Sequence, residues 1–130
     1  MTFKLLGQLP SGKNRIIVTR TGHRFPDPKS RFPKWRDEVM KQIIKQYNRN
    51  YIQTNNRPIA MTERCAMVVD YVPGDARVRD VPGMLDALCH VLAKAGIVKD
   101  DGLIRDVEWH EFPMDREAPM ATVTIIQFAR

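Results

Sequence analysis

Cysteine is scarce in this chain, and several familiar catalytic motifs are absent. The 130 residues include two cysteines, Cys65 and Cys89, which show neither a CxxC spacing nor the density of a disulfide framework. We therefore expect two small buried thiols rather than a zinc site or a disulfide. The sequence also has no Gly-rich phosphate loop, no nucleophile elbow and no HExxH segment, which removes the motif signatures of nucleotide hydrolases, serine hydrolases and zinc proteases.

Long apolar segments are absent as well. No apolar run approaches the roughly 18 residues that a membrane-spanning helix needs. Residues 1–8 lack the long apolar core of a secretory signal. These absences predict a cytoplasmic protein that does not span a membrane.

Positive charge is what the chain has in excess. It contains 21 lysines and arginines against 15 acidic residues, for a net charge of +6 and a pI of about 9.6. Its length and ordinary apolar content suit a single domain, residues 1–130, with one core. A basic protein of this kind suits a polyanionic partner such as nucleic acid or an anionic membrane surface.

Hydrophobic periodicity predicts the element order βββαβαββ. This order indicates an α+β fold, in which two main helices pack on one side of a single mixed, mostly antiparallel sheet. The second helix has clear signals at both ends, with Asp80 as its N-cap and Gly96 just past its last turn. The predicted strands are residues 3–6, 15–19, 23–25, 61–72, 103–112 and 121–128, and the predicted helices are residues 33–47 and 81–94.

Carboxylates gather around the second predicted helix. Asp80 stands at its beginning, Asp100 and Asp101 follow its end, and Asp75 and Asp106 lie nearby in the sequence. Mg²⁺ prefers oxygen ligands and is usually held by one or two carboxylates together with water and substrate phosphate. We therefore expect the acids at the two ends of this helix to converge on one cation-sized gap, although single acidic turns are also common on protein surfaces.

Basic residues lie close to these acids in the sequence. Arg77 and Arg79 directly precede Asp80, and Lys99 directly precedes Asp100. Lysine and arginine make the phosphate contacts that dominate affinity for nucleic acids. A second basic cluster occupies and follows the first predicted hairpin: Lys13, Arg15, Arg20, Arg24, Lys29 and Arg31.

One further pair is notable on the second helix. Asp86 and His90 are four residues apart and so point the same way. Such a pair can share a metal or relay a proton, or it can simply be polar surface on an exposed helix face.

Two segments together resemble the RusA family of Holliday-junction resolvases. Residues 9–15 (Leu-Pro-Ser-Gly-Lys-Asn-Arg) are similar to the Pro-Ser-x-x-Asn-Arg opening of that family. Residues 74–101 contain a basic stretch leading to Asp80, a helix of similar length, a Lys-Ala-Gly helix end at residues 94–96, and the paired Asp100 and Asp101. The likeness in order and spacing covers nearly the whole chain and is most specific over residues 75–106.

The resemblance implies a homodimeric protein, often encoded by phages or prophages, that cuts four-way DNA junctions in recombination and repair. The implied cofactor is Mg²⁺ or Mn²⁺, and the implied partner is branched DNA. In that family, acids at the start of this helix and in the later loop bind the metal. Carried over, this makes Asp80 and Asp101 the first metal-ligand candidates and Asp100 the next, with Arg77 and Arg79 contacting phosphates.

The start of the helix departs from the family pattern of Asp-x-Asp-Asn followed by a lysine four residues after the second aspartate. Here Pro82 replaces the second acid, Gly83 the asparagine and Asp86 the lysine. Asp86, one turn after Pro82, can supply the missing carboxylate. Alternatively, residues 84–88 match a later stretch of the family, and one helical turn has been lost and regained.

The missing lysine has candidates elsewhere in the chain. Lys13 or Lys99 can meet that need in space. Together with three arginines named above, these two lysines make up the predicted DNA contacts: Lys13, Arg15, Arg77, Arg79 and Lys99.

Three functional hypotheses remain. The first is a metal-dependent endonuclease in which Asp80 and Asp101, with Asp86 or Asp100, hold a metal that activates water. The second is a protein of the same fold that binds branched DNA without cutting it, which Pro82 and Asp86 favour. The third is a basic interaction module that has no role on DNA.

Overall fold

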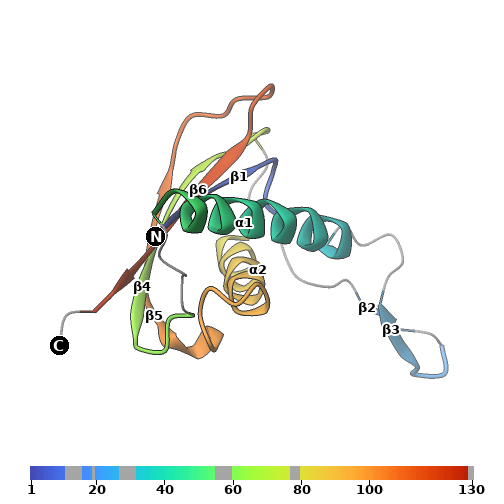
Figure 1. Cartoon of the computed structure of the whole chain (residues 1–130). Coiled ribbons are helices and arrows are strands. Elements are labelled where there is room, and N and C mark those ends of the chain that lie inside the picture. The colour runs from blue at the N-terminus through green and yellow to red at the C-terminus, as the bar shows by residue number, and fades with distance from the viewer. Residues whose placement is uncertain (11–15, 19, 27–31, 55–59, 77–79, 129–130) are drawn as a thin grey trace.

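The main sheet has four strands in the order β1-β6-β4-β5, as seen in a computed structural model of the chain (Figure 1). The edge strand β1 (Thr2–Leu6) pairs antiparallel with β6 (Met120–Gln127), and β6 pairs antiparallel with β4 (Cys65–Val72). The other edge strand, β5 (Ile104–Glu111), runs parallel to β4. The structure describes residues 1–10, 16–18, 20–26, 32–54, 60–76 and 80–128.

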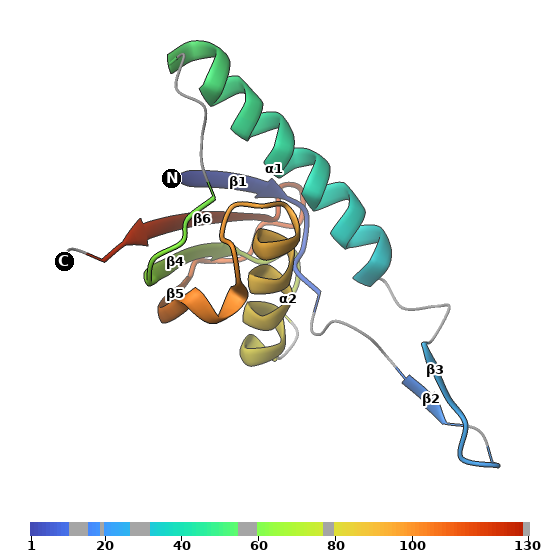
Figure 2. The same ribbon diagram turned by 60° about the horizontal axis from the view of Figure 1, so that its bottom comes forward.

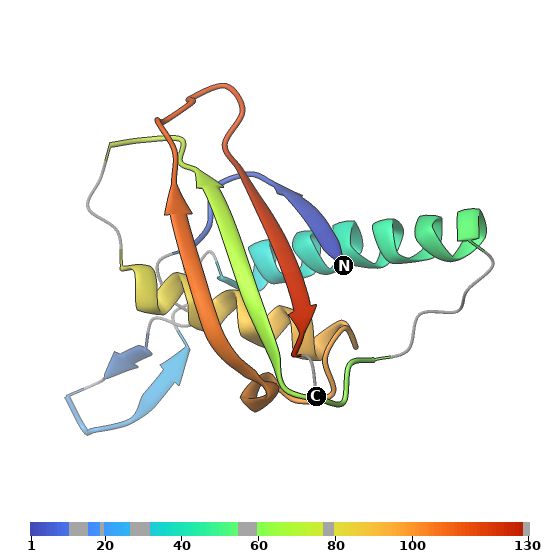
Figure 3. The ribbon, with the colours of Figure 1, turned by 90° about the vertical axis from the view of Figure 1, so that its left-hand side faces the viewer.

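Two helices, α1 (Phe32–Thr54) and α2 (Val81–Lys94), cover one face of this sheet. Figure 3 views the opposite face, with both helices behind the strands. A 3₁₀ helix, η1 (Asp101–Leu103), leads into β5. This arrangement confirms the predicted α+β fold with a mixed, mostly antiparallel sheet and two main helices on one side.

A separate hairpin lies outside the main sheet. It consists of β2 (Ile16–Val18) and β3 (Arg24–Pro26), which pair antiparallel in a sheet of their own. Figures 1 and 2 show it standing away from the main sheet and the two helices.

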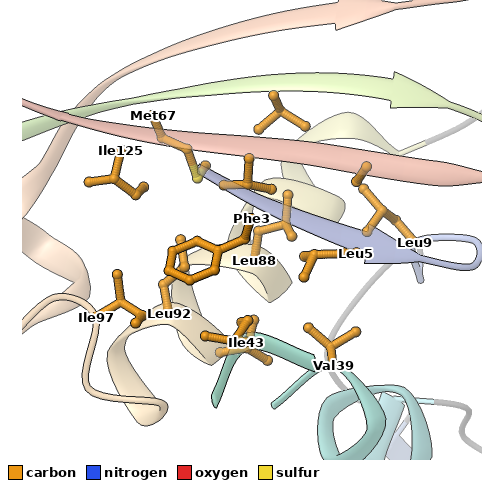
Figure 4. Packing of buried hydrophobic residues seen from close by; sticks show 14 of the residues in the cluster. Phe3, Leu5, Leu9, Val39, Ile43, Met67, Leu88, Leu92, Ile97 and Ile125 are labelled. Atoms are coloured by element: carbon orange, nitrogen blue, oxygen red, sulfur yellow. The ribbon is translucent and has the colours of Figure 1, made fainter. Parts of the chain in front are cut away.

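The hydrophobic core lies between the sheet and the helices. Alternate residues of β4 are buried because successive side chains of a strand point to opposite faces. Figure 4 shows Phe3 and Leu5 of β1 meeting Leu88 of α2 and Ile43 of α1 in this layer. The sheet therefore holds both ends of α2 in place through one continuous apolar contact.

The two cysteines differ in their surroundings. Cys65 lies inside the core, where its Sγ donates to the Leu103 carbonyl at 3.6 Å and burial raises the pKa of its thiol. Cys89 is only partly buried, at the margin of the core on α2. Neither thiol forms a disulfide. Cys65 is the buried thiol that the sequence predicts, whereas Cys89, also predicted to be buried, is only partly so.

The unit β4-α2-β5 explains why one edge of an otherwise antiparallel sheet is parallel. Parallel neighbours need a crossover, and α2 supplies it. The helix begins and ends as predicted, with Asp80 at the N-cap and Gly96 just past its end at φ 80°. The crossover therefore fixes Asp80 in the connection after β4 and Asp101 in the connection before β5.

Two element boundaries differ from the predictions by more than one residue. The first helix extends to Thr54, although the sequence predicts its end at Tyr47. Asparagine lowers helix propensity by only a few tenths of a kcal/mol, and no glycine or proline interrupts this stretch, so helix propagation continues through it. At the other boundary, β4 begins at Cys65 rather than Met61, which instead forms an isolated bridge with Val98.

Glutamines of α1 cover the free edge of β1. Gln46 Oε1 accepts from the Lys4 backbone N–H at 2.8 Å, and Gln46 Nε2 donates to the Lys4 carbonyl at 2.7 Å. One turn earlier, Gln42 Oε1 accepts from the Leu6 N–H at 2.8 Å. Because an open strand edge is a template for pairing with other chains, these contacts both anchor α1 and block that edge.

We expect Gln46→Glu to lower the free energy of unfolding by about 1–2 kcal/mol, because it removes a donor and places a carboxylate against the Lys4 carbonyl. Gln42→Glu is the matched control, since the Leu6 contact uses only the side-chain oxygen, and its cost should stay within about 0.5 kcal/mol. Urea unfolding at neutral pH measures both. Equal losses in the two variants would contradict the assigned contacts.

Candidate functional site

Asp80 is held at the start of α2 by the cap it forms. Its Oδ1 accepts from the Gly83 N–H at 3.2 Å, and its carbonyl accepts from the Met84 N–H at 3.0 Å. Pro82 fits the first turn because the backbone donor it lacks would have no partner there. The residue is exposed, so its carboxylate serves the cap and still faces solvent beside the positive end of the helix dipole.

The other acid proposed on α2 lies further along the helix. Asp86 is exposed, one turn after Pro82. His90 is half-buried, and its ring lies 5.8 Å from the ring of Phe32 at the start of α1. His90 therefore packs partly into the interface between the helices and is not simply polar surface.

The paired acids after α2 stand in a short, well-defined turn. Asp100 caps η1, with its Oδ1 accepting from the Gly102 N–H at 2.7 Å. Asp101 is exposed in the single turn of η1, and Lys99 is exposed just before the pair. The Lys99 backbone N–H donates to the Met61 carbonyl at 2.9 Å, which anchors the turn. This turn thus presents two carboxylates and one ammonium group to solvent.

A single chain does not gather these acids at one point. A helix the length of α2 spans about 20 Å, with Asp80 at its start. Beyond its end the chain turns back and η1 contacts α2, but Figure 3 shows η1 well apart from the first turn of the helix. Within the described residues, no three histidine, cysteine, aspartate or glutamate side chains lie close enough to hold a metal ion.

The expected convergence of Asp80, Asp100 and Asp101 on one gap is therefore wrong for one chain. The physical reason is that a full helix separates the two connections in which these acids lie. The individual roles assigned to the acids stay predictions. Asp100 and Asp101 alone already offer the one or two carboxylates that Mg²⁺ usually takes from a protein.

Two other acids, Asp75 and Asp115, have structural contacts that the sequence did not indicate. Asp75 Oδ2 accepts from Gln8 Nε2 at 2.8 Å, which ties the segment after β1 to the segment after β4. Asp115 Oδ1 accepts from the backbone N–H groups of Glu117 and Ala118 at 3.0 and 3.3 Å and shapes the β5–β6 connection. For Asp115, the only sequence signal is that aspartate side chains in turns often accept hydrogen bonds from nearby backbone N–H groups.

The predicted DNA contacts fall into two groups. Lys13, Arg15, Arg77 and Arg79 lie outside the described residues. Lys99 is described and is exposed beside the paired acids. Arg20 and Arg24, which belong to the second basic cluster, are exposed at the tip of the β2–β3 hairpin.

Comparison of the sequence with models of known protein families and with curated proteins finds no match. None of the helices in the described part of the chain is long and apolar enough to cross a membrane.

Proposed function

We propose that the chain is a metal-dependent, structure-specific DNA endonuclease that cuts four-way junctions in recombination and repair. The observation that carries this proposal is the exposure of Asp80, Asp100 and Asp101 at the two connections of α2 in a chain of net charge +6. A protein that only held DNA would gain nothing electrostatically from carboxylates beside its phosphate contacts. A cation between acid and phosphate removes that conflict.

Asp80 and Asp101 are the proposed principal metal ligands, and Asp100 or Asp86 completes the set. Mg²⁺ or Mn²⁺ bound there would orient a water molecule, lower its pKa and neutralise charge on the phosphate. In the hydrolysis, water adds to phosphorus, one P–O bond of the backbone breaks, and the departing oxygen takes a proton. Lys99 stands beside the paired acids, where an ammonium group can bind a neighbouring phosphate.

Because Asp80 and Asp101 do not meet within one chain, the proposed site takes Asp80 from one subunit and Asp101 from its partner. A two-fold symmetric dimer would then carry two identical sites. This number suits a four-way junction, in which two strands of like polarity must be cut. The dimer is thus part of the proposed chemistry and not only a means of binding.

The test is incubation of an end-labelled four-way junction with the protein and Mg²⁺ or Mn²⁺, followed by a denaturing gel. We expect paired, symmetric nicks, and a loss of at least about 100-fold in rate for Asp80→Asn and Asp101→Asn, because removing a metal ligand costs more than removing a group that only orients one. Glu38→Gln on the exposed face of α1 is the matched control and should cut at the wild-type rate. Full activity in Asp80→Asn would refute the assignment.

A second function is favoured by Pro82, which lies in the first turn of α2 where the RusA pattern has its second aspartate. In that case the chain binds branched DNA without cutting it. Junction binding that is salt-sensitive, independent of divalent ions and unaccompanied by nicks would establish it. Calorimetric Mg²⁺ titration of the wild type against Asp101→Asn separates the two functions, because only the nuclease requires the site to take up the ion.

A further inference from the structure

The positive charge of this protein is concentrated at one end of its sequence. Residues 1–36 contain nine lysines and arginines and one acid, a net charge of +8. The remaining 94 residues contain twelve basic and fourteen acidic side chains, a net charge of −2. The net positive charge of the whole chain therefore resides in the segment that contains the β2–β3 hairpin.

The hairpin presents part of this charge away from the rest of the molecule. Its strands pair with each other through the register Ile17↔Phe25 and take no place in the main sheet. Residues 20–24 at its tip are all exposed and include Arg20, His23 and Arg24. The tip turn contains Gly22 at φ 81°, a backbone conformation that glycine adopts without strain.

We infer that the β2–β3 hairpin is an arm that grips duplex DNA, with its tip in or along the major groove. The major groove of B-DNA is about 12 Å wide and admits a two-stranded ribbon. Arginine suits this position because its guanidinium group binds phosphate oxygens or a guanine edge in a bidentate manner. A two-stranded hairpin is only marginally stable by itself, so a partner that neutralises its charge also stabilises it.

The place of the arm links it to the proposed nuclease site. In Figures 2 and 3 the hairpin lies on the side of the molecule where α2 begins, which is the side of Asp80. A duplex held by the arm would therefore pass the acid that caps α2. The inference rests on the proposed function for its DNA partner, but it concerns binding alone and does not depend on cleavage.

The test measures the affinity of the full chain for a fluorescein-labelled duplex and a labelled four-way junction over a range of salt concentrations. We expect Arg20→Glu/Arg24→Glu to weaken binding to both at least about 10-fold near 100 mM salt. Arg20→Ala/Arg24→Ala should reduce the slope of log Kd against log salt by about 2, one for each phosphate that the protein no longer neutralises. Lys41→Glu/Lys45→Glu on the exposed face of α1 makes the same change in net charge and should weaken binding less than about 3-fold.

Three outcomes would overturn the inference. One is an unchanged affinity and salt slope in the arginine variants, and another is an equal loss in the α1 variant, which would make net charge the only cause. The third is a change in oligomeric mass by ultracentrifugation with DNA affinity intact, which would make a second copy the partner of the arm. Failure of the nuclease proposal looks different, since the arm variants would still lose binding while the wild type would bind without producing nicks.

Discussion

Mixing chains that carry Asp80→Asn with chains that carry Asp101→Asn is expected to restore nicking that neither variant shows alone. In a mixed dimer, one shared site combines the intact Asp80 of one subunit with the intact Asp101 of the other. The second site has neither acid. Random pairing makes about half of the dimers mixed, and each has one complete site of two, so about a quarter of the wild-type sites should return.

The pattern of products is as informative as their amount. A dimer with one working site makes single nicks, so the mixture should nick junctions without resolving them. The control mixes Asp80→Asn with the double variant Asp80→Asn/Asp101→Asn, because no pairing of those chains contains a complete shared site. The two chains are co-expressed with different tags so that mixed dimers can be isolated. If wild type cuts but the isolated mixed dimer stays as inactive as each parent, the site lies within one chain or uses other acids.

Local sequence signals predict α2 and the acidic turn after it, but they do not predict the distance between Asp80 and Asp101. Local signals were sufficient for α2, because a cap such as Asp80 and a stop such as Gly96 act through neighbouring backbone groups. The same locality placed Asp100 and Asp101 correctly in a turn. Whether the turn meets the cap depends on the length of the intervening helix and on the return path of the chain. The sequence pattern therefore predicted that Asp80 and the paired acids lie closer together than they do within one chain.

The contacts of α1 with the edge strand β1 also could not be predicted from local sequence signals. The apolar stripe of α1 was readable from its spacing, and Val39 and Ile43 are buried as that stripe predicts. That spacing leaves Gln42 outside the stripe and offers Gln46 only as an alternative to Tyr47 at its end. Their role depends on which strand lies at the sheet edge, and strand order is a property of the whole topology. Glutamines one turn apart on a helix, after a short first strand, are the only signal that points to it.

Ile43 and Ile44 show where the apolar face of α1 ends. The i, i+4 spacing of apolar residues within residues 33–47 predicts a helix face that contains Val39 and Ile43 and is widened by Met40 and Ile44. In the structure Ile43 is 0% exposed, whereas Ile44 is 44% exposed. Adjacent helix positions differ by about 100° in direction, so a helix that lies on a flat layer buries one and leaves the other at the margin.

This difference predicts unequal losses from the same substitution. Ile43→Ala should lower the free energy of unfolding by about 2–5 kcal/mol, because it opens a cavity between α1, β1 and α2 where Figure 4 places this side chain. That is a large part of the roughly 5–15 kcal/mol that stabilises a typical domain. Ile44→Ala removes the same atoms from a half-exposed position and gains helix propensity, so its cost should stay below about 1 kcal/mol.

Urea unfolding of the two variants at several protein concentrations checks this prediction. The slope of the free energy against urea should match wild type in both, so that the midpoints report stability directly. Equal losses independent of concentration would mean that α1 is rotated about its axis relative to the sheet. A loss at Ile44 that grows as the protein is concentrated would mean that a second copy covers this residue, which would place the dimer contact on the outer face of α1.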